Sequence, residues 1–245
     1  MKIISLMKKY RQKKISVIIP AYNEENRIYN SLKKIRDYLS RKNYSFEIIV
    51  VDDGSRDNTA QVAGRIRDKR LRIIKYRKNQ GKGYAVRTGM LAAKNNLALF
   101  CDADLSTPIE ELGKFMKSIK DYDIIVGSRV VEGHKIVRKQ PRFRVLLGGI
   151  FSKITRIVLP VNVQDTQCGF KLFKNCKPIF KKQTLDGWAF DVEILFIARQ
   201  KGTKILEIPV IWNDASGSKL NPFRDSLKML LEIARIKINS FLGRY

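Results

Sequence analysis

Three apolar runs of strand length end abruptly in acidic or small residues within the first half of the chain. They lie in the segments 15–26 (ISVIIPAYNEEN), 48–59 (IIVVDDGSRDNT) and 98–108 (ALFCDADLSTP). Continuous β-branched runs of this kind are typical of parallel strands that are buried on both faces. Open α/β sheets bind their ligands outside the carboxyl ends of such strands. The acidic residues therefore mark a candidate binding edge of a sheet.

Segments with helical spacing separate these strands. Apolar residues recur every three or four positions over 25–41, which predicts a helix there. Regular alternation of strands and helices implies right-handed crossovers between parallel strands. We therefore expect an α/β fold with a Rossmann-like, mostly parallel central sheet flanked by helices. The other elements expected in this half are helices over 58–69, 81–95 and 109–119 and strands over 71–76 and 123–126.

The second half of the chain is organised differently. A compact, cysteine-bearing segment over 165–173 precedes an expected helix over 190–199 and an expected strand over 205–212. Over 222–241 the apolar residues follow the helical period and basic residues punctuate the other side. This pattern predicts an amphipathic helix at a membrane interface. We divide the chain into a basic N-terminal arm (1–14), one main domain (15–220) and this interfacial helix (221–245).

The chain is strongly basic. Its 245 residues include 49 Lys+Arg against 23 Asp+Glu, a formal charge of +26. Such a charge attracts polyanions, which include nucleic acid, an anionic membrane surface and phosphorylated substrates. The basic residues are dispersed, and no RNP, KH, zinc-finger or helix-turn-helix signature is present. Nucleic-acid binding is therefore kept only as an alternative from a different functional class.

Cysteine and histidine content narrows the chemistry further. Three cysteines do not make a paired disulfide framework, and a single histidine excludes a histidine-cluster metal site. No apolar stretch approaches the roughly 20 residues of a spanning helix, and the apolar part of the basic opening segment is too short for a signal peptide. We expect a cytoplasmic protein that is soluble or peripheral to a membrane.

Two aspartates separated by one residue follow the third buried strand. A pair such as Asp102 and Asp104 suits a hard divalent cation, Mg²⁺ or Mn²⁺, held against diphosphate oxygens. The sequence Gly81-Lys82-Gly83 combines a flexible backbone with a cation, which suits a neighbouring phosphate but is also compatible with a solvated turn. Together these features predict a site for a nucleotide diphosphate.

Seven motifs occur in a fixed order: PAYNEE, VVDDGSRDNT, NQGKGYAVRTGM, DADLSTP, GSR, DTQCGFKLF and WAFDVEIL. In this order they resemble the family 2 glycosyltransferases with a GT-A fold, and most of all the dolichyl-phosphate (polyprenyl-phosphate) β-glucosyltransferase and mannosyltransferase branch. The resemblance runs from about residue 15 to about residue 220. It implies an inverting transfer of glucose from UDP-glucose to dolichyl (polyprenyl) phosphate, with a nucleotide-sugar half over 15–129 and an acceptor half over 130–220.

The resemblance also implies which residues contact the donor. The segment after the first strand lines the nucleotide pocket, Asp52 contacts the base, and the acidic pair holds the metal. Lys82 and Lys219 are expected to reach the diphosphate. The donor residues carried over in this way are Pro20, Ala21, Tyr22, Glu24, Asp52, Asp53, Lys82, Asp102, Ala103, Asp104 and Lys219.

Two departures from the mannosyl relatives bear on the donor. Those relatives often carry glutamine where this chain has Ser106, and they carry an arginine where the shorter segment 213–217 has none. Both departures favour UDP-glucose, although the same reaction with GDP-mannose or UDP-GlcNAc stays open.

On the acceptor side the resemblance assigns Arg129 to the lipid phosphate. A phosphate monoester has a second pKa of about 6 and is already a nucleophile at neutral pH, so it needs cations rather than a base. Arg142 and Arg144 are expected partners of that phosphate, or else surface residues. The apolar stretch 145–159 and the C-terminal helix would hold the lipid and an anionic membrane surface on the cytoplasmic face; the alternative is ordinary core helices.

Three further acidic or amide residues complete the predicted site. Asp165 and Gln167 either shape the sugar pocket or belong to a structural turn. Asp191 either contacts the sugar or acts at a helix N-terminus. If the acceptor were instead a saccharide hydroxyl, Asp191 would have to serve as the base.

Overall fold

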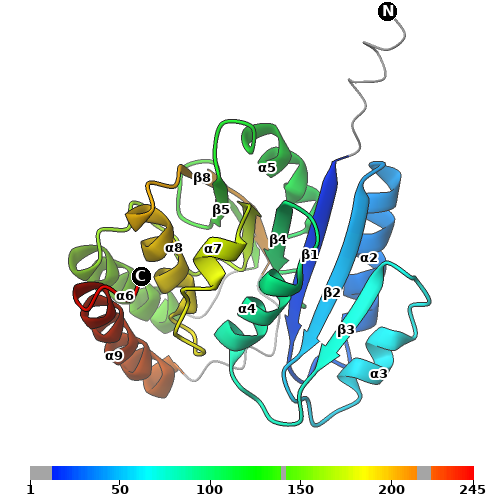
Figure 1. Ribbon diagram of the computed structural model, residues 1–245, viewed down its shortest axis with the longest axis horizontal. Coiled ribbons are helices and arrows are strands. Elements are labelled where there is room, and N and C mark those ends of the chain that lie inside the picture. The colour runs from blue at the N-terminus through cyan, green and yellow to red at the C-terminus, as the bar shows by residue number, and fades with distance from the viewer. Residues whose placement is uncertain (1–12, 139–141, 214–221) are drawn as a thin grey trace, which may run out of the picture.

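A seven-stranded sheet forms the centre of the molecule (Figure 1), a computed structural model that describes residues 13–138, 142–213 and 222–245. The strand order is β3-β2-β1-β4-β7-β5-β8. Every strand of this sheet runs parallel to the others except β7, which is antiparallel to both β4 and β5. The predicted α/β fold with a mostly parallel sheet is therefore confirmed. The strands are β1 (Lys14–Ala21), β2 (Ser45–Asp52), β3 (Leu71–Lys75), β4 (Leu97–Cys101), β5 (Ile124–Ser128), β7 (Phe170–Lys174) and β8 (Ile205–Pro209).

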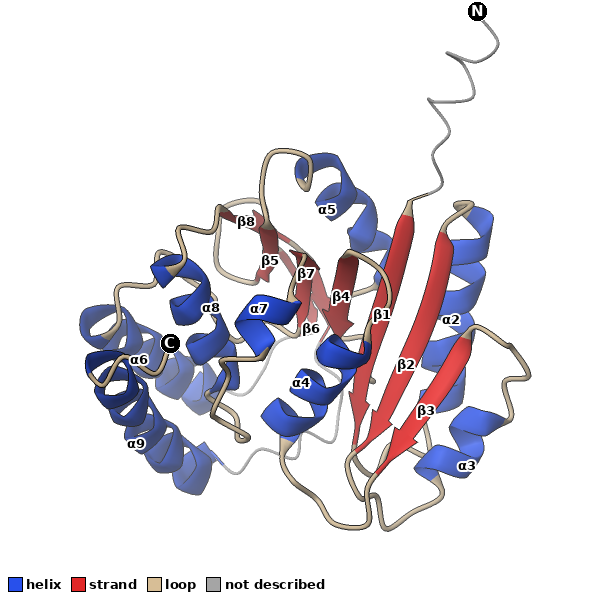
Figure 2. Cartoon of the chain, viewed as in Figure 1, coloured by secondary structure: helices blue, strands red, loops and turns tan. Residues whose placement is uncertain are grey.

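Helices cover both faces of the sheet (Figure 2). Because successive side chains of a strand point to opposite faces, Val17 packs in one core with helices α2 and α5, whereas its neighbour Ile18 packs in the other with α4, α7 and α8. Because the side chains on both faces of the sheet are buried, the sequences of these strands are unbroken apolar runs. The helical elements are α2 (Ile28–Arg41), α3 (Thr59–Gly64), α4 (Lys82–Ala92), η1 (Ile109–Glu111), α5 (Leu112–Ser118), α6 (Arg142–Val158), α7 (Lys177–Phe180), α8 (Phe190–Gln200) and α9 (Pro222–Phe241).

Two strands depart from the sequence prediction. The compact segment over 165–173 contributes the strand β7 to the middle of the sheet. The single strand expected over 205–212 divides after Pro209, which lacks the N–H needed to continue a ladder. Beyond it, β9 (Ile211–Asn213) pairs instead with β6 (Lys135–Arg138) in a separate two-stranded sheet.

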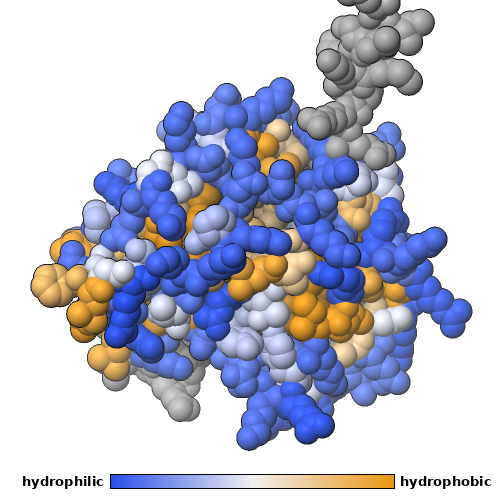
Figure 3. All heavy atoms as spheres, in the orientation of Figure 1, coloured by the Kyte–Doolittle hydropathy of each residue, from blue (hydrophilic) through white to orange (hydrophobic). Residues whose placement is uncertain are grey.

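Helix α9 begins and ends where the sequence predicts. One side of it packs into the core through Met229, Ile233 and Ile236. Its other side exposes large apolar side chains, among them Leu231, and the neighbouring helix α6 exposes further apolar surface. In Figure 3 apolar atoms gather at the left-hand edge, over α6 and α9. Within the described ranges no helix is both long and apolar enough to cross a membrane.

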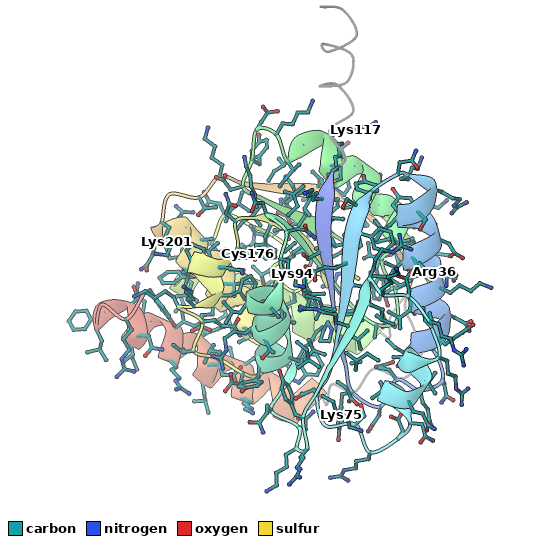
Figure 4. All side chains as sticks on the ribbon, turned by 45° about the vertical axis from the view of Figure 1, so that its right-hand side comes forward. Arg36, Lys75, Lys94, Lys117, Cys176 and Lys201 are labelled. Atoms are coloured by element: carbon teal, nitrogen blue, oxygen red, sulfur yellow. The ribbon has the colours of Figure 1, made fainter. Side chains whose placement is uncertain are left out.

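Basic side chains extend from many different elements rather than from one face. Figure 4 labels examples on α2, β3, α5 and the ends of α4 and α8. They are Arg36, Lys75, Lys117, Lys94 and Lys201. This dispersion differs from the concentrated basic stripe of a nucleic-acid-binding domain.

Candidate active site

The acidic residues predicted from the sequence gather at one edge of the sheet. Strands β2, β1 and β4 are parallel neighbours, so Asp52, Ala21 and Asp102 come to the same carboxyl edge. The antiparallel strand β7 brings its beginning to this edge as well, where the N–H of Asp102 donates to the carbonyl of Gly169 at 3.1 Å. A Cβ atom at position 169 would lie 1.8 Å from Asp102 Oδ2, so a side chain there would collide with that carboxylate.

Lys82 lies directly against the acidic pair. Its Nζ is 2.7 Å from Asp102 Oδ1, and both side chains are half-buried at the start of α4 and the end of β4. Asp104 is also half-buried, and its Oδ1 accepts the N–H of Ser106 at 2.9 Å. Burial and the neighbouring charge of Asp102 raise the pKa of Asp104. Two carboxylates thus share a small volume in which a further cation would be stabilised.

A divalent cation fits this donor set. Burial, and after it the charge of Asp102, raises the pKa of Asp104, and carboxylate oxygens are ligands that Mg²⁺ and Mn²⁺ prefer. Among the residues that the structure describes, no group of three or more histidine, cysteine, aspartate or glutamate side chains could hold a metal. Asp102 and Asp104 would be the residues that hold such an ion, and Mg²⁺ is commonly bound in proteins through one or two carboxylates together with substrate phosphates.

The two aspartates at the end of β2 are placed differently. Asp52 is fully buried; its Oδ1 accepts the N–H of Ser55 at 2.9 Å, whereas Oδ2 makes no hydrogen bond within the described part of the chain. Lys75 Nζ lies 3.9 Å from Oδ2. A buried acceptor without a donor is costly, so a ligand N–H at Oδ2 would stabilise the site.

The carboxylate of Asp53, in contrast, already accepts hydrogen bonds from the protein. It accepts the backbone N–H groups of Gln80 and Gly81 at 2.8 and 2.9 Å and the side-chain amide of Asn79 at 2.8 Å. It therefore shapes the turn that leads into α4 and Lys82.

The segment after β1 is tied to the segment after β2. The N–H of Glu24 donates to Thr59 Oγ1 at 2.7 Å, and its carboxylate pairs with Arg27. The carbonyl of Ala21 accepts the N–H of Asp53 at 2.8 Å. Pro20 and Tyr22 flank Ala21 and are half-buried, whereas Ala103 is buried between the paired aspartates.

Arg129 follows β5 and forms a bidentate ion pair with Asp165. Its Nε and Nη2 each lie 2.7 Å from the Asp165 carboxylate, and its backbone N–H donates to the same carboxylate at 2.9 Å. Burial works against both charges, but the pair outweighs it, so the pKa of Arg129 is raised and that of Asp165 is lowered. The guanidinium also lies over the ring of Trp212, 5.5 Å from its centroid. Both side chains are thus held in one orientation.

Asp191 is neutralised by a lysine to which the sequence analysis gave no role. The fully buried Lys171 of β7 pairs with Asp191 on α8, and its Nζ also donates to the carbonyl of Cys168 at 2.7 Å. Burial raises the pKa of Asp191, against the opposing charges of Lys171 and Lys82. One feature of the sequence could have revealed this pair: Lys171 stands among apolar residues, and a buried charge is rarely tolerated without a partner.

The remaining predicted residues lie partly outside this geometry. Gln167 directs its amide at Met229 Sδ on α9, 3.2 Å away. Arg142 and Arg144 are in the first turn of α6, but their side chains lie outside the described residues, as does the whole of Lys219. Trp188 is a second residue that the sequence analysis missed; its ring centroid lies 5.3 Å from Lys82 Nζ.

Comparison with known proteins agrees with this architecture. The family model described as glycosyl transferase family 2 matches residues 16–176. Dolichyl-phosphate β-glucosyltransferase of Dictyostelium discoideum is 35% identical over 247 residues, which cover 94% of this chain and 75% of that protein. The Homo sapiens protein of the same name is 34% identical over 251 residues, covering 95% of this chain and 78% of its own length.

Solved structures share the fold at lower identity. The glucosyl-3-phosphoglycerate synthase of Mycobacterium tuberculosis, solved with Mn²⁺, UDP and phosphoglyceric acid, superposes with a TM-score of 0.65 at 17% identity, covering 99% of this chain and 82% of that one. The extent of the sequence matches, rather than this likeness of fold, decides the family. The chain belongs to glycosyl transferase family 2, and relatives that match nearly all of it are dolichyl-phosphate β-glucosyltransferases.

Proposed function

We propose that the protein transfers glucose from UDP-glucose to dolichyl phosphate with inversion at the anomeric carbon. The observation that carries this proposal is the similarity to dolichyl-phosphate β-glucosyltransferases over more than nine-tenths of the chain, together with an acidic pair and an arginine at one sheet edge. The two departures at Ser106 and 213–217 support glucose rather than mannose.

Each residue of the donor site has a proposed task. The orphaned Oδ2 of Asp52 accepts an N–H of the uracil ring, and the segment Pro20–Glu24 lines the nucleoside. Asp102 and Asp104 hold Mg²⁺ or Mn²⁺. When bound, this cation offsets the charge that accumulates on departing UDP. Lys82 adds a second positive charge beside the diphosphate. A solved structure of similar fold was obtained with bound Mn²⁺ and UDP, so the fold can accommodate both ligands.

The acceptor needs no general base in this arrangement. A lipid phosphate dianion attacks the anomeric carbon with an oxygen that carries no proton, the bond from that carbon to the UDP oxygen breaks, and UDP leaves with the bonding electrons. We assign Arg129 to the acceptor phosphate because Asp165 fixes its guanidinium fork and leaves Nη1 without a hydrogen bond in the described part of the chain. Asp191 already has a partner in Lys171, so we assign it to the architecture of the site.

We also propose that α6 and α9 rest on the cytoplasmic face of a membrane. These helices and the residue that follows α9 expose five large apolar side chains, called here the apolar face: Ile157, Leu231, Ile238, Phe241 and Leu242. Exposed cations on the same two helices suit anionic headgroups. These are Lys153, Arg156, Lys228, Arg235 and Lys237.

The decisive experiment supplies donor and acceptor together. The purified protein is incubated with dolichyl phosphate, Mg²⁺ and, in parallel, UDP-glucose, UDP-GlcNAc or GDP-mannose, and the lipid product is analysed by mass spectrometry. Hexosyl transfer from UDP-glucose alone supports the proposal. Transfer from GDP-mannose alone would overturn the donor assignment, and no lipid product from any donor would overturn the acceptor assignment.

A further inference from the structure

The segment 186–189 lies directly against the glycine turn that begins α4. The carbonyl of Asp186 accepts the N–H groups of Gly83 and Tyr84 at 2.8 and 3.3 Å. A Cβ atom at Gly81, where φ is +107°, would lie 2.3 Å from the same carbonyl. The position of this segment and the position of the Lys82 backbone are therefore coupled.

Helix α9 holds the same segment from the other side, through Glu232. One carboxylate oxygen, Oε2, accepts the N–H of Ala189 at 3.1 Å. The other, Oε1, would lie 2.4 Å from a Cβ atom at Gly187. Burial raises the pKa of this half-buried carboxyl group. The carboxylate is thus fitted closely against the backbone of 187–189.

Between these two contacts, Trp188 meets the donor-site cation. Its ring centroid lies 5.3 Å from Lys82 Nζ, the atom that is 2.7 Å from Asp102 Oδ1. A cation over an indole face is attracted by the electron-rich ring. The ammonium group is therefore placed between an indole and a carboxylate.

We propose that Glu232 is a positioning residue of the donor site. By holding the backbone at Gly187–Ala189 it keeps Trp188 against Lys82, which directs the ammonium group toward Asp102 and the donor diphosphate. This inference rests on the proposed function for the identity of the ligand, but the contacts themselves are present without any ligand.

We expect the folding of α9 to depend little on this carboxylate. Met229, Ile233 and Ile236 bury their side chains in the core and anchor the helix by apolar packing. Loss of the Glu232 carboxylate should therefore affect the donor site more than overall stability. That separation makes a positioning role testable against a purely structural one.

The first test needs no ligand. The chain has two tryptophans, so a Trp212→Phe background leaves Trp188 as the only indole fluorophore. In this background Glu232→Ala should raise the acrylamide quenching constant of Trp188 by about twofold, because the indole loses its backbone support. Glu232→Gln keeps an oxygen that can accept the Ala189 N–H and should stay near the parent value. The exposed Glu132→Ala is the matched control and should change nothing.

The second test measures the dissociation constant of UDP in the presence of Mn²⁺ by calorimetry. It uses the parent sequence, which retains Trp212. Glu232→Ala should raise it about fivefold and Glu232→Gln by less than about twofold. Gly187→Ala should resemble Glu232→Ala, because its methyl group takes the place of the carboxylate. The control Gly64→Ala meets only ordinary van der Waals contact, at 3.8 Å, and should bind UDP as the parent does.

The outcomes separate the two proposals. If Glu232→Ala lowers the melting temperature but leaves both the quenching constant and UDP affinity unchanged, Glu232 is a structural residue and the inference is wrong. The inference would also be wrong if Glu232→Gln and Glu232→Ala changed the quenching constant and the dissociation constant of UDP equally. If the parent protein fails to bind UDP with Mn²⁺, the proposed function fails, while the quenching data still decide whether Glu232 positions Trp188.

Discussion

Opposite charges at this sheet edge are arranged in pairs: Lys82 with Asp102, Lys171 with Asp191, and Arg129 with Asp165. Asp104 has no such ion pair within the described part of the chain, and its pKa is raised by burial and by Asp102. At the scale of single residues, this unpaired carboxylate is therefore the member of the Asp102–Asp104 pair whose loss should most directly test the proposed metal site.

Asp104→Asn tests this assignment. The amide keeps the shape of the side chain but is a poorer ligand for a hard cation, so turnover with Mg²⁺ should fall by about 100-fold or more. The melting temperature without ligands should not fall, because the variant removes a repulsive charge beside Asp102. The exposed Asp121→Asn is the control. Unchanged steady-state turnover in Asp104→Asn would contradict the metal role.

Arg129→Lys tests the acceptor site. Lysine retains the charge but cannot reproduce the two parallel hydrogen bonds of the guanidinium fork to Asp165. We expect the KM for dolichyl phosphate to rise about tenfold or more, with UDP affinity nearly unchanged. Kinetics with each substrate varied separately, and calorimetry with UDP, measure the two effects. If the variant weakened the use of dolichyl phosphate and the binding of UDP equally, the acceptor assignment would be wrong.

Lys171→Met tests the buried pair. Removing the cation leaves Asp191 charged and buried, which should lower the free energy of unfolding in urea by about 3–5 kcal/mol. Adding Asp191→Asn removes the unpaired charge and should restore a large part of that loss. A single variant as stable as the parent would show that Lys171 is dispensable for the fold.

At the scale of secondary-structure elements, the apolar face of α6 and α9 makes a prediction about membranes. Replacing Ile238 and Phe241 by serine keeps the helix and leaves its buried side unchanged, since both side chains are exposed. Binding to vesicles containing anionic lipid should fall about tenfold in a flotation assay, because two large apolar groups no longer enter the interface.

The control for the membrane prediction lies on a different surface of the protein. Tyr29 on α2 is also exposed, and Tyr29→Ser removes an apolar ring without touching α6 or α9. It should bind vesicles as the parent protein does. If the Ile238/Phe241 variant binds equally well, the apolar face is not the membrane contact.

The elements also differ in how far the sequence predicts them. Strands β1, β2 and β4 are predictable because each is an unbroken apolar run, and helix α9 because its apolar residues keep the helical period over its whole length. Strand β7 was missed because Lys171 interrupts its apolar pattern. That lysine is tolerated only through its distant partner Asp191, and a pairing across the fold cannot be read from local periodicity. The pairing of Arg129 with Asp165 escaped prediction for the same reason.

At the scale of the whole molecule, ligand binding should be coupled to stability. A ligand that binds only the folded state stabilises it by about 2.7 kcal/mol at a concentration 100 times its dissociation constant. UDP with Mg²⁺ should therefore raise the melting temperature by several degrees, and EDTA should cancel the shift. EDTA alone should leave the melting temperature unchanged, because we propose that the metal binds together with UDP. A shift by UDP that survives EDTA would argue against metal-assisted binding.

One short segment, 165–169, connects the proposed acceptor site with the proposed donor site. Asp165 at one end of the segment 165–169 grips Arg129, and Gly169 at the other end abuts Asp102. In the proposed function, the length of this loop therefore helps to set the distance between the acceptor phosphate at Arg129 and the donor at Asp102. Lengthening that loop by one residue would move the reactants out of line even if every side chain named above were retained.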